Sequence, residues 1–207
     1  MTTSKMSGIT QCFRCLAQRN ILEEWKFYMF KHKKVLWITR TAVLIALTVV
    51  LQAVTLQLGN QIITGSVVNL MLIISVMTCG LPTGLTVGLF TPIMPTLLGF
   101  GPVWPIVPFI AAGNMALVAA WFFIGNRKFG IIYVSYGLAT IAGATVKFLI
   151  LYFGIVRIAL PYILGLTGQN AMSILFSYPQ LITASIGGIC AAILLPSLMK
   201  ATKANLE

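Results

Sequence analysis

The sequence predicts an all-α membrane protein with six transmembrane helices. Of its 207 residues, 58% are hydrophobic and only 8% are charged, and the mean hydropathy is +0.96. This composition excludes a soluble globular protein, whose surface needs far more charged side chains. Apolar runs that approach the length needed to cross a bilayer, about 20 residues, recur from residue 38 to the C-terminal end.

Six apolar runs define the expected spans. They cover residues 38–58, 63–79, 84–98, 105–124, 131–156 and 178–199. The second and third are joined by a Pro/Gly turn at residues 79–84, so we expect them to form a closely packed hairpin. Neither a polar linker nor an internal repeat divides the spans. Residues 38–200 are therefore expected to form one domain, between a basic N-terminal segment (1–37) and a cytoplasmic tail (201–207).

The N-terminal segment is basic and partly aromatic. Residues 25–34 mix four aromatic side chains with four lysines, a composition that suits either an interfacial helix or a loosely ordered cytoplasmic tail. Cys12 and Cys15 form one C-x-x-C pair, but a closed zinc site needs four ligands and the chain has a single histidine, His32. We therefore expect no metal centre and no cofactor in this chain.

The distribution of basic residues predicts the orientation. Eight of the 14 Lys and Arg residues precede or open the first span, two (Arg127, Lys128) lie between the fourth and fifth, and two (Lys200, Lys203) follow the sixth. Only Arg157 lies on the opposite side. By the positive-inside rule both termini face the cytoplasm of a multi-pass protein of the cell membrane. The net charge of +11 is expected to meet anionic lipid rather than nucleic acid.

Lys147 is the most informative single residue. It lies within an apolar span, and the sequence has no acidic residue between Glu24 and Glu207 that could neutralise it. Counted from the inner end of its span, it lies about 24 Å into a core about 30 Å thick. A buried ammonium without a carboxylate needs backbone carbonyls, amide oxygens, water, a lowered pKa or a ligand anion. Alternatively, its long stem could carry the amine outward to the membrane surface.

Neutral polar side chains gather on the outer half of the expected bundle, because successive spans alternate in direction. They are Gln52, Gln57, Asn60, Asn69, Asn114, Gln180 and Thr183. Asn and Gln also link helices by hydrogen bonds worth about 1 kcal/mol in membranes, and this alternative stays open for Asn114 and Gln52. We expect Lys147, Gln180, Asn114, Asn69 and Gln57 to contact a ligand.

Aromatic side chains surround the expected outer mouth, where they would either stack on a ligand or form the aromatic belt of the membrane interface. They are Trp104, Phe109, Tyr152, Tyr162, Phe176 and Tyr178. Trp104 and Tyr178 are included among the expected ligand contacts. Connections rich in Gly and Pro at residues 59–66, 99–108 and 164–179 are candidates for a lid over a small ligand.

Several sequence stretches resemble those of the substrate-binding S component of an energy-coupling factor (ECF) transporter. A basic lead precedes a first span with Ala42 and Ala46 at small-x-x-x-small spacing, and residues 63–69 read Ile-Thr-Gly-Ser-Val-Val-Asn. Residues 80–89 read Gly-Leu-Pro-Thr-Gly-Leu-Thr-Val-Gly-Leu, and residues 107–114 read Val-Pro-Phe-Ile-Ala-Ala-Gly-Asn. The similarity extends over about residues 38–199; the long basic N-terminal segment departs from it.

The resemblance implies a small subunit that captures a water-soluble vitamin or related micronutrient from outside. It would deliver this ligand through a transmembrane coupling subunit attached to two ATPase subunits, which use the ATP. In that family the alanine face of the first helix meets the coupling subunit, which assigns this role to Ala42 and Ala46. The chain itself has no G-x-x-x-x-G-K-[ST] phosphate loop and no carboxylate in its spans, so its energy source must lie in a partner.

Two other classes of function are weighed against this one. A membrane enzyme would need an acid, base, nucleophile or metal set, and with no Asp in the chain and no His within the spans we expect no catalysis and no catalytic residue. A self-sufficient facilitator or channel would need polar positions along its whole length. The polar residues favour one half instead. Which ligand is bound is not readable from these residues, although an unpaired lysine favours an anionic or carbonyl-rich one.

Overall fold

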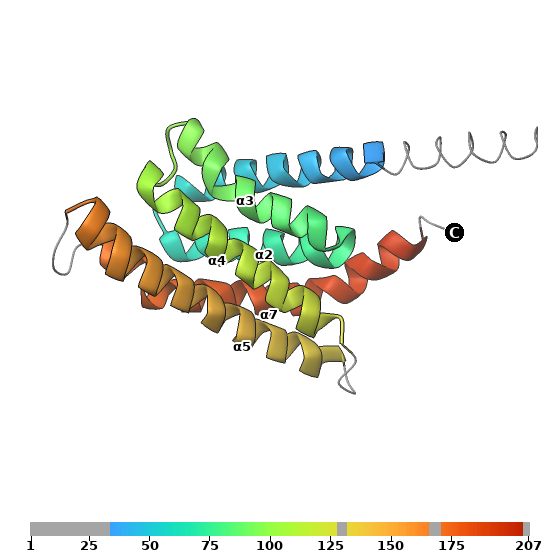
Figure 1. Cartoon of the computed structure of the whole chain (residues 1–207). Helices are drawn as coiled ribbons and strands as arrows, with labels where there is room; N and C mark the ends of the chain where they lie inside the picture. The colour runs from blue at the N-terminus through green and yellow to red at the C-terminus, as the bar shows by residue number, and fades with distance from the viewer. Residues whose placement is uncertain (1–33, 128–131, 166–170, 205–207) are drawn as a thin grey trace, which may run out of the picture. The chain divides into compact units, whose positions relative to one another are not determined.

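The computed structural model describes residues 34–127, 132–165 and 171–204, and they are almost entirely helical, with no strand among them. The chain separates into two compact units, Met1–Arg40 and Thr41–Glu207. Of the first unit only residues 34–40 are described. The expected interfacial segment, Cys12, Cys15 and His32 therefore lie outside the described residues. The bundle described below belongs to the second unit (Figure 1).

Five helices among the described residues are long and apolar enough to cross a membrane. Their bounds are Lys34–Leu56, Gln61–Cys79, Trp104–Gly125, Ile132–Ile163 and Met172–Lys200. A further apolar helix, α3 (Leu81–Leu97), has 17 residues and contains Pro92 and Pro95. The prediction of an all-helical bundle with membrane-length helices is confirmed.

Local sequence signals set the start and end of α2 (Gln61–Cys79). The side chain of Asn60 caps its first turn by accepting a hydrogen bond from the backbone N–H of Ile62 at 2.9 Å. At the other end Gly80 has φ +89°, a conformation that residues with a side chain rarely adopt. Pro82 follows in the first turn of α3. The turn between α2 and α3 is therefore a single glycine, shorter than the six-residue turn expected from the sequence.

The later helices run longer than the apolar runs suggest. A 3-10 turn, η1 (Trp104–Ile106), leads into α4 (Val107–Ala120), which ends in a π-helical segment, η2 (Trp121–Gly125). Next, α5 (Ile132–Leu151) continues directly into a second π-helical segment, η3 (Tyr152–Ile163). Arg157, which the sequence placed in a loop, therefore lies within a helix, where its guanidinium carbon is 5.6 Å from the ring centre of Tyr152.

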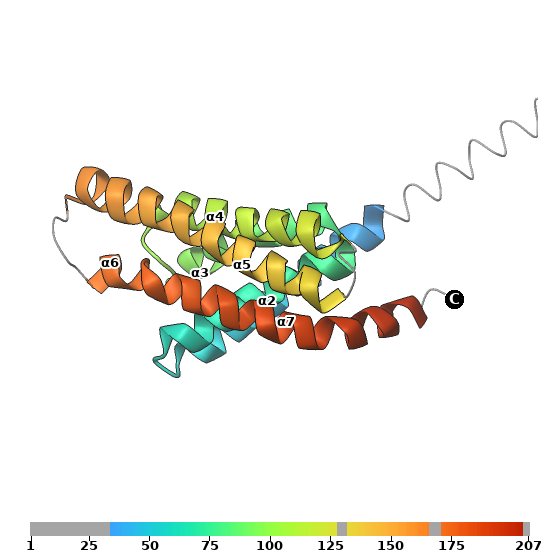
Figure 2. The ribbon, with the colours of Figure 1, turned by 90° about the horizontal axis from the view of Figure 1, so that it is seen from below.

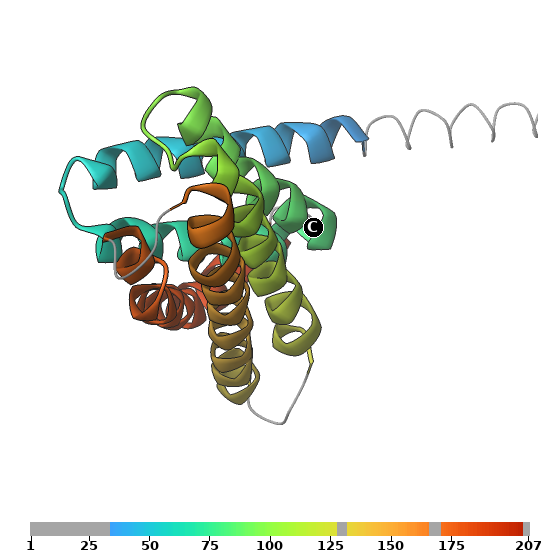
Figure 3. The ribbon, with the colours of Figure 1, turned by 60° about the vertical axis from the view of Figure 1, so that its left-hand side comes forward.

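The helices of the second unit form a closed ring. Around it α2 packs on α7 (Tyr178–Ala204), α7 on α5, α5 on α4, α4 on α3, and α3 on α2. Figure 2 shows α2, α7 and α5 side by side, and Figure 3 shows α7 and α4 on opposite sides of α5. A short helix, α6 (Ala171–Leu175), precedes α7. The part of the first helix that belongs to this unit packs on the ring through Leu44 and Ile45.

An apolar core fills one half of this ring. It is built around the fully buried Trp121 and Tyr136, whose ring centres lie 5.6 Å apart, and around aliphatic residues of α2, α3, α4 and α7. Hydroxyl groups within the helices mostly bond the backbone oxygen one turn earlier, as Thr91 does with Val87 at 2.5 Å. Such bonds satisfy hydroxyl groups in an apolar environment. The buried polar side chains of this half are hydroxyl groups such as those of Ser75 and Thr140, which bond the backbone of their own helices, whereas the lysine and the amides lie elsewhere.

Candidate ligand-binding site

A cavity of about 270 Å³ opens at the end of the bundle opposite this core. It is bounded by the C-terminal ends of the first helix, α3 and α5, and by the N-terminal parts of α2, α4 and α7. Its lining residues are Gln52, Leu56, Gln61, Thr64, Gly65, Val68, Thr91, Pro92, Phe100, Gly101, Pro102, Ile106, Ile110, Asn114, Lys147, Leu151, Met172, Leu175, Phe176 and Gln180. Because consecutive helices are antiparallel, residues far apart in the sequence meet at one level.

Lys147 supplies the ammonium group of the cavity wall. Its side chain is only 4% exposed, so it does not extend outward to the surface. The Nζ atom donates hydrogen bonds to Oδ1 of Asn69 at 2.5 Å and to Oδ1 of Asn114 at 2.7 Å. An ammonium has three N–H donors, so one donor remains. It has no partner among the described residues, and the side chain lines the cavity.

The two asparagine amides are held in orientation by their other ends. Nδ2 of Asn69 donates to Oγ1 of Thr183 at 3.3 Å, and Thr183 in turn donates to the backbone oxygen of Gln180 at 3.1 Å. Nδ2 of Asn114 donates to the backbone oxygen of Gly88 at 3.4 Å. Both amide oxygens therefore face the lysine. The cluster joins α2, α3, α4, α5 and α7 and replaces a carboxylate by two neutral acceptors.

Close helix packing brings these groups within hydrogen-bonding distance. A Cβ atom added to Gly187 of α7 would lie 2.8 Å from Cβ of Asn69, and one added to Gly65 of α2 would lie 2.9 Å from the side chain of Thr183. Distances below 3.0 Å are closer than real side chains allow. The glycines therefore let α2 and α7 approach until Asn69 and Thr183 can bond.

Gln52 is an additional polar group in the wall. Its Oε1 is buried, and no described residue donates a hydrogen bond to it. Gln180 is 9% exposed and is already tethered, because its Nε2 donates to the backbone oxygen of Leu175 at 3.3 Å. The remaining wall is mainly aliphatic, with the aromatic rings of Phe100 and Phe176. The cavity thus combines apolar walls with a few polar groups, as small-molecule sites do.

The structure brings together only some of the residues expected to contact a ligand. Lys147, Asn114 and Gln180 line the cavity. Asn69 does not line it and is linked to it only through the hydrogen bond from Lys147. Gln57 is exposed and does not line the cavity, because it lies beyond the end of the first helix.

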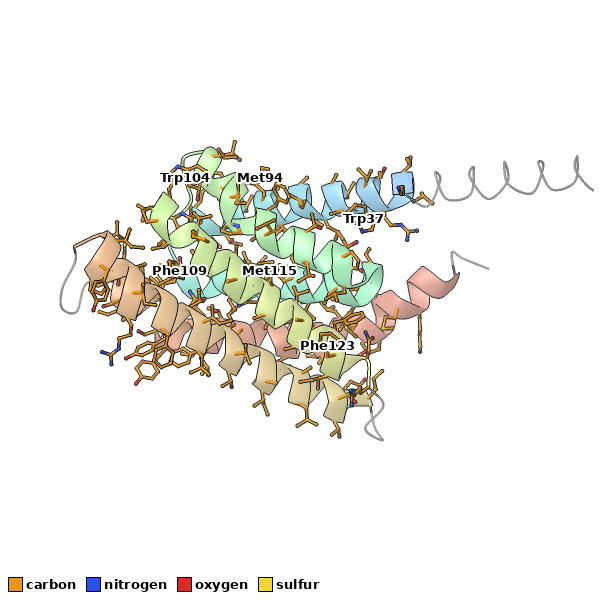
Figure 4. The ribbon with its side chains drawn as sticks, viewed as in Figure 1. Trp37, Met94, Trp104, Phe109, Met115 and Phe123 are labelled. Carbon is orange, nitrogen blue, oxygen red and sulfur yellow. The ribbon has the colours of Figure 1, made fainter. Side chains whose placement is uncertain are left out.

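The two expected aromatic contacts also lie outside the cavity. Tyr178 is 78% exposed and stacks on Phe148 with ring centres 6.2 Å apart. Trp104 is 54% exposed and lies at the edge of the bundle (Figure 4). Phe109 packs against η3, the helical segment that continues α5. Of the six mouth aromatics, Phe176 is the one that lines the cavity.

Residues of two connections also line the cavity, as a lid would require. Phe100 and Pro102 come from the connection between α3 and η1, and Phe176 comes from the turn after α6. The Gly/Pro content of these connections indicated them, but nothing in the sequence distinguished the residues that face inward. The lining residues from the range of the first connection, Gln61, Thr64 and Gly65, belong to α2, because this helix begins already at Gln61.

Comparisons with known proteins return no match: none was found among protein-family models, curated proteins or solved structures. Among the described residues no group of three His, Cys, Asp or Glu side chains could hold a metal ion. The chemistry of the site is that of one ammonium, four side-chain amides, two threonine hydroxyls and apolar walls.

Proposed function

We propose that this chain is the substrate-binding membrane subunit of an ATP-driven importer of the ECF type, which captures a small water-soluble vitamin or related micronutrient. The observation that carries the proposal is the cavity at one end of the bundle, with the buried Lys147 in its wall and an apolar core behind it. A cavity that ends at a packed core suits capture. Conduction needs a polar path along the whole bundle.

The proposed orientation places the cavity at the outer face of the cell membrane and both termini in the cytoplasm. The positions of Arg127 and Lys200 support it, since both lie at the end of the second unit opposite the cavity. Positive residues are retained on the cytoplasmic side. A cavity facing outward would meet nutrients before they cross the membrane.

Import would be driven by partners: a transmembrane coupling subunit and two ATPase subunits. Ala42 and Ala46 are both exposed in the second unit, next to an exposed apolar stripe that includes Val43, Leu47 and Val50. Small side chains allow another helix to approach closely. We assign the coupling subunit to this face. The resemblance of the sequence to ECF S components supports that choice of partner.

Uptake assays test whether the cavity binds the ligand while the face around Ala42 and Ala46 binds the coupling subunit. In proteoliposomes that contain the coupling module, Ala46→Leu should abolish ATP-dependent uptake and leave ligand retention, measured by native mass spectrometry, unchanged. Ile141→Trp adds bulk on α5, where the side chain is 67% exposed, and should change neither. Lys147→Met should reduce retention itself.

The alternative function, a self-sufficient facilitator, predicts a different result. It would transport in proteoliposomes that contain this chain alone, at a rate independent of ATP. Uptake without the coupling module, at the rate seen with it, would refute the proposed importer subunit.

A further inference from the structure

We propose that the cavity binds a compact, non-cationic molecule that presents a carbonyl or carboxylate oxygen to Lys147 and an N–H or O–H group to Gln52. This inference rests on the proposed function, because it specifies what the subunit captures. It follows from two polar groups that the protein leaves incompletely bonded and from the charge and size of the cavity.

Lys147 defines the first contact. Two of its three N–H donors are engaged by Asn69 and Asn114, and the third has no partner among the described residues. Each of the two asparagine Nδ2 groups donates one of its two N–H groups away from the lysine, to Thr183 and to Gly88 respectively. A carbonyl or carboxylate oxygen would complete the ammonium's hydrogen bonds, and hydrogen bonds to charged groups are the stronger kind.

Gln52 defines the second contact. Its buried Oε1 accepts no hydrogen bond from any described residue, and the side chain lines the same cavity as Lys147. Leaving a buried acceptor unpaired is costly, and buried polar groups without a partner are rare in native proteins. A ligand N–H or O–H supplies what is missing. An apolar ligand would fill the space and leave both groups unsatisfied.

The charge of the cavity further restricts the class of ligand. The sequence has no acidic residue between Glu24 and Glu207, so no carboxylate of the described chain can offset a cation in the cavity. A positively charged ligand would meet the Lys147 ammonium inside a low-dielectric wall, where like charges repel strongly. A single ammonium is also a poor match for a ligand with several negative charges. The favoured ligand is therefore neutral or carries one negative charge.

Size sets the last limit. A volume of about 270 Å³ lies just below the range of about 300–1,000 Å³ typical of small-molecule pockets. We therefore expect a compact molecule, on the order of one substituted six-membered ring.

A fragment library tests the inference without knowledge of the natural ligand. The full-length protein in lipid nanodiscs is screened by ligand-observed NMR against neutral carbonyl compounds with an N–H, their N-methylated counterparts, monocarboxylates with an O–H, and cations. The pair 2-pyridone and 1-methyl-2-pyridone represents the first two groups. We expect the first and third groups to bind, and N-methylation or a positive charge to weaken binding about tenfold or more.

Variants assign the contacts. Gln52→Leu should remove the preference for N–H compounds over N-methylated ones, and Lys147→Met should remove binding of both. The matched control is Gln57→Leu, which changes an exposed glutamine outside the cavity and should alter nothing. The N-methylated pairs probe the same contact in the unaltered protein, so the test does not depend on the folding of any variant.

The outcomes separate the inference from the proposed function. Binding that depends on Lys147 but is indifferent to N-methylation and to Gln52→Leu overturns the assigned contact and leaves a capture subunit standing. Preferential binding of cations overturns the ligand class in the same way. Binding of no fragment at all overturns both, because the cavity would then not be a ligand site.

Discussion

A double-mutant cycle between Lys147 and Asn69 tests whether the lysine is held by neutral amides. Asn69→Leu removes the acceptor of the 2.5 Å bond from Nζ and the donor of the 3.3 Å bond to Thr183. Hydrogen bonds to charged groups contribute about 1.5–3 kcal/mol and neutral ones about 1 kcal/mol. We therefore expect the single substitution to lower the free energy of unfolding by about 2.5–4 kcal/mol.

The cost should be much smaller when the ammonium is already absent. In a Lys147→Met background, Asn69→Leu loses only the bond to Thr183 and should cost about 1 kcal/mol or less. The coupling energy between the two positions is then about 1.5–3 kcal/mol. Neutral hydrogen bonds between membrane helices average only about 0.6 kcal/mol in such cycles. A large coupling would thus identify a charge-assisted bond.

The measurement is equilibrium unfolding of the ligand-free protein by SDS titrated into detergent micelles, supported by thermal unfolding. For a chain of this size 1 kcal/mol corresponds to about 2–4 °C in Tm. A control cycle pairs Asn69→Leu with Tyr136→Phe, a buried residue of the opposite apolar core, and should be additive within about 0.5 kcal/mol. Equal additivity in the Lys147 cycle would refute the hydrogen-bonded cluster.

Three further predictions concern packing and topology. Gly187→Ala should destabilise the protein by about 1–3 kcal/mol because the new Cβ would lie 2.8 Å from the facing α2 side chain, whereas Gly137→Ala, with nothing within 4 Å, should be neutral or slightly stabilising in the same unfolding assay. Trp121→Ala should lower the free energy of unfolding by about 3–5 kcal/mol, and Trp121→Phe should lower it by less, because the buried indole N–H has no hydrogen bond to lose; equal losses would contradict this. In a cysteine-free background, Leu58→Cys should react with a membrane-impermeant thiol reagent in intact cells and Asn126→Cys only after permeabilisation; the reverse pattern would invert the proposed orientation.

Composition and hydrophobic run length predicted the helices because a bilayer leaves few alternatives. With no water in the membrane core, each span must satisfy its own backbone, so apolar runs become helices. Boundaries were less accurate where a helix continues past the apolar run. Arg157 illustrates this, since its charge ended the predicted span while η3 continues to Ile163. A charge near a membrane surface does not interrupt a helix when its side chain can reach the interface.

The sequence predicted the charged residue of the site, but it did not predict which other side chains line the cavity. The depth and isolation of Lys147 indicated a polar site, and alternating helix direction indicated which amides would be near it. The direction in which a side chain leaves its helix is set by tertiary packing. Thus Asn69 lies behind the lysine, Tyr178 faces outward, and Phe100 faces the cavity. None of these differences is visible in spacing alone.

The way Lys147 is held has a consequence for the proposed transport cycle. Its two acceptors, Asn69 and Asn114, are themselves fixed by bonds to α7 and α3, so the ammonium is already positioned before a ligand arrives. A preorganised group loses little freedom on binding, which strengthens affinity. The same rigidity makes release unfavourable unless the cluster is disturbed. Because the cluster links five helices, a force that shifts one helix against another would weaken it, and in the proposed importer that force comes from the partner ATPases.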